Sequence, residues 1–137
     1  MLSLTALALV LPSAVQAIVC FDTQYRELQG KLVQDGVRLV NRSDATYCVF
    51  APQGDAVEKR EVALFPVGPA NDAVENYDKL FDSSAPPLYS IRAACIFERY
   101  NLAGVSYMFR CVCRTDRCNK ATTLDAFLRR QVQDDVL

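Results

Sequence analysis

The chain has 137 residues, with 15 basic and 16 acidic side chains, six cysteines and no histidine, and its formal net charge is −1. This charge balance argues against a nucleic-acid-binding protein, in which basic residues gather into a stripe or patch. Without histidine the chain has no Ser-His or Cys-His nucleophile and lacks the most common general base near neutral pH. The acidic residues form no patterned pair. The composition therefore favours a protein that is not an enzyme and that uses no cofactor.

Residues 1–17 have the pattern of a secretory signal peptide. They contain no charged side chain, and Pro12 ends an almost wholly apolar run that is too short to span a bilayer as a helix. Val15 and Ala17 suit the −3 and −1 positions of a signal-peptidase site. We therefore expect a secreted, extracellular protein whose mature chain starts near Ile18, with no membrane anchor in this chain. The alternative for this segment is an N-terminal helix buried in the domain.

The residues between the signal peptide and position 53 favour extended strands. Apolar and β-branched residues concentrate in three stretches, 18–26, 31–40 and 45–52. Within the second stretch, Asp35-Gly36 is a strong signal for a tight hairpin turn. Asn41 begins the sequon Asn-Arg-Ser, which predicts an N-linked glycan on an exposed loop.

The long segment between the second and third cysteines changes its period along its length. Its first part predicts a strand that ends at Pro66, because proline rarely continues a strand. Val74, Tyr77 and Phe81 then recur at the spacing of one helix face. This pattern predicts a short helix near 73–81.

A hairpin is expected over 91–113, where two alternating stretches flank the sequence Asn-Leu-Ala-Gly. If the two cysteines of these stretches face each other, the register sets three pairs opposite one another: Cys95 and Cys111, Phe97 and Phe109, and Arg99 and Tyr107. This register leaves 102–104 as a three-residue loop that ends in Gly104, the residue best suited to a left-handed conformation.

The C-terminal segment 121–137 predicts an amphipathic helix near 123–134, with Thr122 or Thr123 as its N-cap. Its apolar positions recur at helical spacing, at Leu124, Phe127, Leu128 and Val132. Acidic and basic residues balance on its polar side, so we expect the helix to pack on its own domain rather than on a membrane surface.

The cysteines follow the predicted signal peptide and are even in number, at Cys20, Cys48, Cys95, Cys111, Cys113 and Cys118. In an oxidising compartment they predict three disulfides, whose connectivity the spacing alone does not determine. A structural zinc site is the alternative for the cluster at 111–118. Such a site normally needs a second short-spaced pair of ligands, and the chain has neither that pair nor a histidine.

The stretch Cys-Val-Cys-Arg-Thr-Asp-Arg-Cys-Asn at 111–119 resembles the carboxyl-terminal signature of three-finger proteins, the superfamily of lymphocyte antigen 6, urokinase-receptor-like and snake-toxin domains. That signature has two adjacent cysteines, four residues that often include an aspartate, and then Cys-Asn. Here Cys113, Asp116, Cys118 and Asn119 match it. The Cys-x-Cys variant resembles secreted invertebrate members, those of nematodes especially.

The resemblance is specific over 95–119 and implies a small, disulfide-rich, mainly β domain at 18–120. Its antiparallel sheet would be three-finger-like, with 49–94 as an enlarged second finger. The implied disulfides are Cys20–Cys48, Cys95–Cys111 and Cys113–Cys118. Asn119 would hydrogen-bond backbone groups at the base of the fingers. Alternate residues of a strand share a face, so two bridges from Cys111 and Cys113 lead us to expect a bulge or bend near Val112.

The resemblance also implies a function, namely a secreted, non-catalytic module that binds an extracellular protein. The partner would be a cell-surface receptor or ion channel, for which the protein would act as a ligand or modulator. A secreted inhibitor of a protease or hydrolase is the alternative. Candidate contact residues lie in the enlarged second finger and at the tip of the third: Leu64, Phe65, Val67, Tyr100, Asn101 and Leu102. The alternative for Leu64 and Phe65 is packing against the helix near 73–81.

The hairpin register gives a testable prediction. Proteolysis of the unreduced protein should yield a peptide pair joined through Cys95 and Cys111, because that register places the two residues directly opposite each other. Mass spectrometry before and after reduction identifies the pair. Recovery of either cysteine in another linkage would contradict the register.

Overall fold

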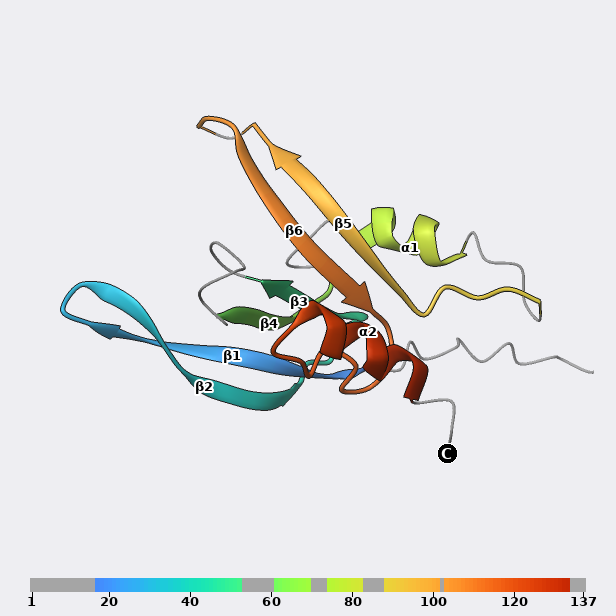
Figure 1. The fold of residues 1–137 in the computed structure, drawn as a ribbon, viewed down its shortest axis with the longest axis horizontal. Helices are drawn as coiled ribbons and strands as arrows, with labels where there is room; N and C mark the ends of the chain where they lie inside the picture. Colours follow the sequence, from blue (N-terminus) through green and yellow to red (C-terminus); the bar gives the residue numbers. More distant parts are fainter. Residues whose placement is uncertain (1–16, 53–60, 70–73, 83–87, 102, 134–137) are drawn as a thin grey trace, which may run out of the picture.

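The structure is a computed structural model that describes residues 17–52, 61–69, 74–82, 88–101 and 103–133. Apart from Ala17, the expected signal peptide lies outside these residues. Antiparallel strands dominate the described chain, as expected for a small, mainly β domain (Figure 1). In chain order the elements are β1 (Val19–Leu28), β2 (Lys31–Asn41), β3 (Tyr47–Pro52), β4 (Val62–Val67), α1 (Val74–Asp82), β5 (Ala93–Tyr100), β6 (Ser106–Cys113) and α2 (Leu124–Gln133).

β1 and β2 form a two-stranded antiparallel sheet whose turn lies at Gln29-Gly30. Both turn residues have positive φ, 53° and 74°. A two-residue turn of this kind matches the right-handed twist of its strands, and glycine adopts it without a steric penalty. The turn at Gln29-Gly30 lets the whole of β1 pair with β2.

The prediction of a hairpin turn at Asp35-Gly36 is therefore wrong. In β2 this pair forms a β-bulge, because Gln24 faces Gly36 whereas Tyr25 faces Gln34. Asp35 is the extra residue, and Gly36 has a φ of 131°, which favours glycine. An Asp-Gly step supplies the same backbone freedom to a bulge as to a turn, so its local signal could not distinguish the two.

The second sheet has four strands in the order β4-β3-β6-β5, with β4 and β5 at its edges. At the β4 edge a side chain takes the place of a further strand. The Thr23 hydroxyl of β1 accepts a hydrogen bond from Leu64 N at 2.8 Å and lies 3.4 Å from Val62 O, to which it donates. Pro66 has no N–H, and its nitrogen points toward this same edge by the alternation of the ladder. The strand therefore continues past the predicted end at Pro66 to Val67.

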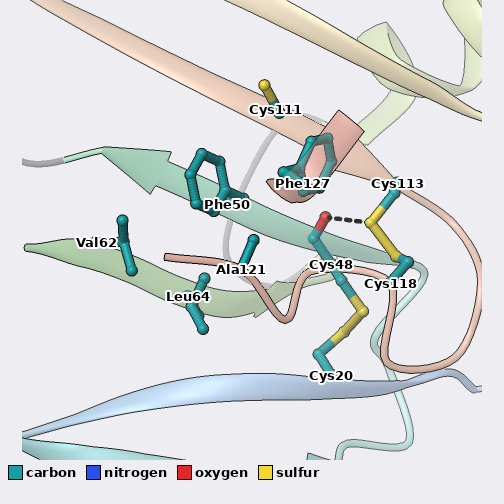
Figure 2. Close-up of a cluster of buried hydrophobic side chains, with 10 residues drawn as sticks. All are labelled: Cys20, Cys48, Phe50, Val62, Leu64, Cys111, Cys113, Cys118, Ala121 and Phe127. Atoms are coloured by element: carbon teal, nitrogen blue, oxygen red, sulfur yellow. Dashed lines mark hydrogen bonds between the residues drawn. A yellow bond between two sulfur atoms is a disulfide. The ribbon is translucent and has the colours of Figure 1, made fainter. Parts of the chain in front are cut away.

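Side chains alternate to the two faces of the four-stranded sheet and form two buried clusters. On one face the cluster includes α2, where Phe127 stacks on Phe50 with ring centroids 5.2 Å apart. Figure 2 shows its members: Cys20, Cys48, Phe50, Val62, Leu64, Cys111, Cys113, Cys118, Ala121 and Phe127. On the other face the cluster includes α1, and its members are Tyr47, Val49, Ala51, Val67, Val74, Tyr77, Phe81 and Val112.

α1 covers one face of the sheet with the residues that helical spacing singled out, since Val74, Tyr77 and Phe81 are all buried. A hydrogen bond fixes the helix on β3, where the Tyr47 hydroxyl donates to Asp78 Oδ1 at 2.5 Å. Burial raises the pKa of the Tyr47 phenol, and the carboxylate of Asp78 raises it further. Tyr47 is therefore a neutral donor throughout the physiological pH range.

α2 begins with Thr123 as its N-cap, whose hydroxyl accepts a hydrogen bond from Ala126 N at 3.1 Å. Only one of the four apolar positions expected to pack is buried, namely Phe127. Leu124, Leu128 and Val132 are exposed, and the residues that α2 buries are Phe127 and Gln131. The Gln131 amide donates to Cys118 O at 2.9 Å, which ties the helix to the cysteine-rich loop.

The structure has the three disulfides that the resemblance implied, Cys20–Cys48, Cys95–Cys111 and Cys113–Cys118. The expected bulge near Val112 is absent, because β6 keeps an unbroken register with β5 and with β3. Cys111 faces Cys95 directly across the ladder. Cys113 ends the strand, and the chain then turns back with Arg117 in a left-handed conformation (φ 60°). Both bridges therefore leave from one face of a regular strand.

Asn119 lies fully buried at the junction of the two sheets. Its Oδ1 accepts a hydrogen bond from Phe21 N at 2.9 Å. Its Nδ2 donates to Phe21 O and to Val49 O, both at 2.9 Å. One side chain therefore joins β1 of the first sheet to β3 of the second, as the resemblance implied for a residue at the base of the fingers.

We predict that Asn119→Asp destabilises the oxidised protein by about 3 kcal/mol or more, because a carboxylate cannot donate to the two buried carbonyls. Denaturant unfolding followed by far-UV circular dichroism measures the change. Asn101→Asp is the matched control at an exposed position and should change stability by less than about 0.5 kcal/mol. Equal effects of the two substitutions would contradict the role of the Asn119 amide.

A second prediction concerns Gly68, which follows β4. A Cβ atom at this position would lie 2.0 Å from the backbone oxygen of Asp44, too close for any side chain. Gly68→Ala should therefore destabilise the fold by about 2 kcal/mol or more, since backbone has to move. Gly30→Ala is the comparison, because a Cβ there has nothing within 4 Å and only the positive φ opposes it. Thermal unfolding of the two variants should rank Gly68→Ala as the less stable.

Candidate functional site

The described residues include no group of histidine, cysteine, aspartate or glutamate side chains that could hold a metal ion. All six cysteines are bonded in disulfides, so their sulfurs are not free thiolates. Most of the large apolar side chains that are exposed lie on the two outer hairpins, β1–β2 and β5–β6, and the others lie on the helices and just before β5.

The structure corrects two of the predicted contact residues in β4. Leu64 and Val67 are 3% and 1% exposed, so they are core residues and not part of an exposed surface that could contact a protein partner. They belong to opposite faces of the sheet, Leu64 to the cluster with α2 and Val67 to the cluster with α1. Phe65 is half-buried and packs against the α1 cluster, as its alternative interpretation held. The run of apolar residues here is the predicted strand, and it is buried on both faces, which the sequence pattern did not show.

The three contact residues predicted at the tip of the third finger, Tyr100, Asn101 and Leu102, have different environments. Tyr100 is half-buried, and its hydroxyl donates to Glu98 Oε2 at 2.9 Å. The same carboxylate pairs with Arg110 at 2.7 Å, and that guanidinium stacks on Tyr77 of α1, 5.2 Å from the ring centroid. Tyr100 is therefore part of a polar network that anchors β5 and β6 over α1. Asn101 is exposed, and Leu102 lies outside the described residues.

The β5–β6 hairpin has the register expected from the sequence, with Cys95 opposite Cys111, Phe97 opposite Phe109 and Arg99 opposite Tyr107. It extends well beyond the rest of the sheet (Figure 1). Ala103 and Gly104 in its loop both have positive φ, 52° and 127°.

One face of this hairpin carries an exposed row of apolar side chains, which we call the aromatic stripe: Phe97, Val105 and Tyr107. Phe97 is 69% exposed, and its ring stacks on that of Tyr107 with centroids 5.5 Å apart and planes 13° from parallel. Alternation along the strand could have located the stripe, since Phe97 and Tyr107 share the face of Cys95 and Cys111. Sequence reasoning placed these residues in register but missed their exposure, because it could not tell how far the hairpin extends past the core.

A groove of about 620 Å³ lies between the β1–β2 hairpin, β4 and the start of α2. Its floor is apolar and buried, made of Val62, Leu64 and Ala121. Phe21 and Val37 of the hairpin form one wall. Figure 2 shows Val62 and Leu64 on β4, with Ala121 near them and β1 passing below this strand. The groove was not predicted, because it joins segments far apart in the sequence.

Asn41, the predicted glycosylation residue, lies exposed at the end of β2, and Ser43 of its sequon is exposed as well. Arg42, between these two residues, is half-buried, so the acceptor and the hydroxyl residue of the sequon are both on the surface. Nearby, Arg42 pairs with Asp44 at 2.7 Å and lowers the pKa of that carboxyl through a side-chain hydrogen bond.

No helix in the described part of the chain is both long and apolar enough to cross a bilayer. A family model matches residues 11–131, and its description is that of a family of unknown function, DUF5354. The chain belongs to this family. Neither the curated proteins nor the solved structures include one that matches it. The match to DUF5354 spans all six cysteines, both sheets and nearly all of α2.

Proposed function

We propose that this protein is a secreted, non-catalytic module of the three-finger type that binds an extracellular protein, as a ligand or modulator of a cell-surface receptor or ion channel. In this proposal the β1–β2 hairpin is the first finger and β5–β6 is the third. The segment that contains β3, β4 and α1 is the enlarged second finger. Three disulfides and the buried Asn119 amide at the base support this assignment. The disulfides also support secretion, because such bonds persist in oxidising compartments.

The observation that carries the proposal is the aromatic stripe. Two stacked aromatic rings and a valine lie exposed on one face of a projecting hairpin, where burial against a partner would remove their apolar surface from water. Aromatic side chains are the most frequent energetic anchors of protein interfaces. Arg99 faces Tyr107 across the ladder and is also exposed, so the proposed partner surface is apolar with an acidic rim.

The hairpin is held in a single geometry before any partner binds. The Cys95–Cys111 bridge crosslinks β5 to β6 two residues from Phe97. The Glu98–Arg110 pair, with an N–O distance of 2.7 Å, and the Tyr100 hydroxyl fix the opposite face of the same strands. Order of this kind lowers the entropy lost on binding, so a small surface can reach useful affinity.

The test is a binding screen of the glycosylated, oxidised protein against an array of extracellular domains, followed by affinity measurement on each partner found. Phe97→Ser should weaken binding at least about tenfold, since it removes a central apolar anchor. Val132→Ser is the matched control, because Val132 is also 69% exposed but lies on α2. It should leave the affinity unchanged.

Two results would contradict the proposal. One is a partner whose affinity is insensitive to Phe97→Ser and Tyr107→Ser while the variants remain folded by circular dichroism. The other is inhibition of an enzyme in a panel of proteases and hydrolases with no receptor or channel bound, which would support the inhibitor hypothesis instead.

A further inference from the structure

The groove between β1–β2, β4 and α2 combines an apolar floor with cations at its rim. Lys120 and Arg130 both line it, together with Gln34 and Thr122. The Lys120 ammonium lies 5.3 Å from the centroid of the Phe21 ring, which forms part of the apolar wall. Arg130 Nε donates to Arg117 O at 3.1 Å, and this bond holds its guanidinium at the rim.

Neither Lys120 nor Arg130 forms an ion pair with any residue that the structure describes. Elsewhere in the described chain several cations have such partners, for example Arg129 with Asp125 one turn back on α2 at 2.8 Å. Two cations that have no carboxylate partner within the described ranges, beside buried apolar side chains, complement a molecule that has an apolar body and one anionic end.

The charge changes along the groove. Gln34 also lines a smaller adjoining hollow of about 230 Å³, whose other residues are Tyr25, Leu32, Val33 and Glu61. The only carboxylate that lines either hollow among the described residues is that of Glu61, at the end away from Lys120 and Arg130. An anionic group is therefore favoured at the Lys120 end and disfavoured at the Glu61 end, which sets one direction for the occupant.

The backbone around the groove offers little to an extended peptide. Leu64 N and Val62 O, on the free edge of β4, are already bonded to the Thr23 hydroxyl. Phe21 N and O are both bonded to the Asn119 side chain. Pro66 has no N–H to donate. A peptide that added itself as a strand would find these groups occupied, whereas an alkyl chain needs no hydrogen bonds.

We propose that this groove binds a free long-chain carboxylate of the fatty-acid class. The alkyl chain lies over Val62, Leu64 and Ala121, and the carboxylate lies between the Lys120 ammonium and the Arg130 guanidinium. Chains too long for the first hollow continue past Gln34 toward Tyr25 and Leu32. The site is separate from the aromatic stripe, so it does not rest on the function proposed above.

The test uses decanoate as the probe, below its critical micelle concentration, with the ¹⁵N-labelled, oxidised protein. Decanoate should cause saturable shifts at the amides of Val37, Leu64, Ala121 and Ala126 in heteronuclear NMR spectra. Decanol, which has the same chain without the charge, should bind at least about fivefold more weakly, because its neutral hydroxyl cannot form an ion pair with Lys120 or Arg130. Octanoate, decanoate and dodecanoate should bind progressively more tightly, by up to about fourfold per methylene.

Two variants keep the proposal falsifiable. Lys120→Gln should weaken decanoate binding by about tenfold and leave decanol binding unchanged. Val37→Asp, at a position that is 45% exposed, should abolish decanoate binding by placing a carboxylate on the wall. Lys79→Gln removes the same charge from α1, on the other face of the sheet, and should have no effect.

Three outcomes would overturn the assignment. The first is the absence of saturable shifts at the groove with any of the three carboxylates. The second is equal affinity for decanol and decanoate, or equal effects of Lys120→Gln and Lys79→Gln. The third is tighter binding at the same amides by the peptide acetyl-Val-Glu-Leu-amide, which would assign the groove to an acidic protein segment.

Discussion

The two sheets of this protein depend on one buried amide. Asn119 reaches the backbone of β1 and of β3 with three hydrogen bonds of 2.9 Å, and no solvent reaches it. An asparagine suits this place because its amide both accepts and donates, and an N–H and two carbonyls have to be matched at once. The neighbouring segment adds main-chain support, since Arg117 N donates to Val19 O and Asp116 accepts from Val19 N.

Sulfur packs around this junction in place of a larger apolar core. The Cys113 sulfur lies 3.5 Å from the carbonyl oxygen of Cys48, beside the Cys20–Cys48 bridge (Figure 2). A domain of this size buries a limited amount of apolar surface, so crosslinks that restrict the unfolded chain contribute a large share of its stability. The helices then cover the two faces of the four-stranded sheet, and the outer hairpins need little further packing to keep their shape.

The parts of the fold that the sequence predicted well are those set by strict periodicity. The register of β5 on β6 follows from alternation and a single cysteine pair, and the buried face of α1 follows from the spacing of Val74, Tyr77 and Phe81. Both are properties of neighbouring residues, which do not depend on the remainder of the chain.

The errors arose where a local signal has more than one tertiary use. Asp35-Gly36 supplies left-handed backbone freedom, which a bulge uses as readily as a turn. Leu64 and Val67 are apolar residues beside a proline, and whether such a segment is buried or exposed depends on what covers its two faces. The groove and the aromatic stripe depend on the lengths and directions of the hairpins, which no single segment encodes.

The crosslink between Cys95 and Cys111 also determines which side chains the hairpin presents. Side chains alternate between the faces of a strand, so a slip of β5 by one residue against β6 would turn Phe97 inward and bring Glu98 to the outer face. A covalent bond between directly opposed residues makes that slip impossible. Oxidation of one cysteine pair thus selects one of two surfaces that the same strand could offer, and the identity of the exposed face is fixed when the bond forms.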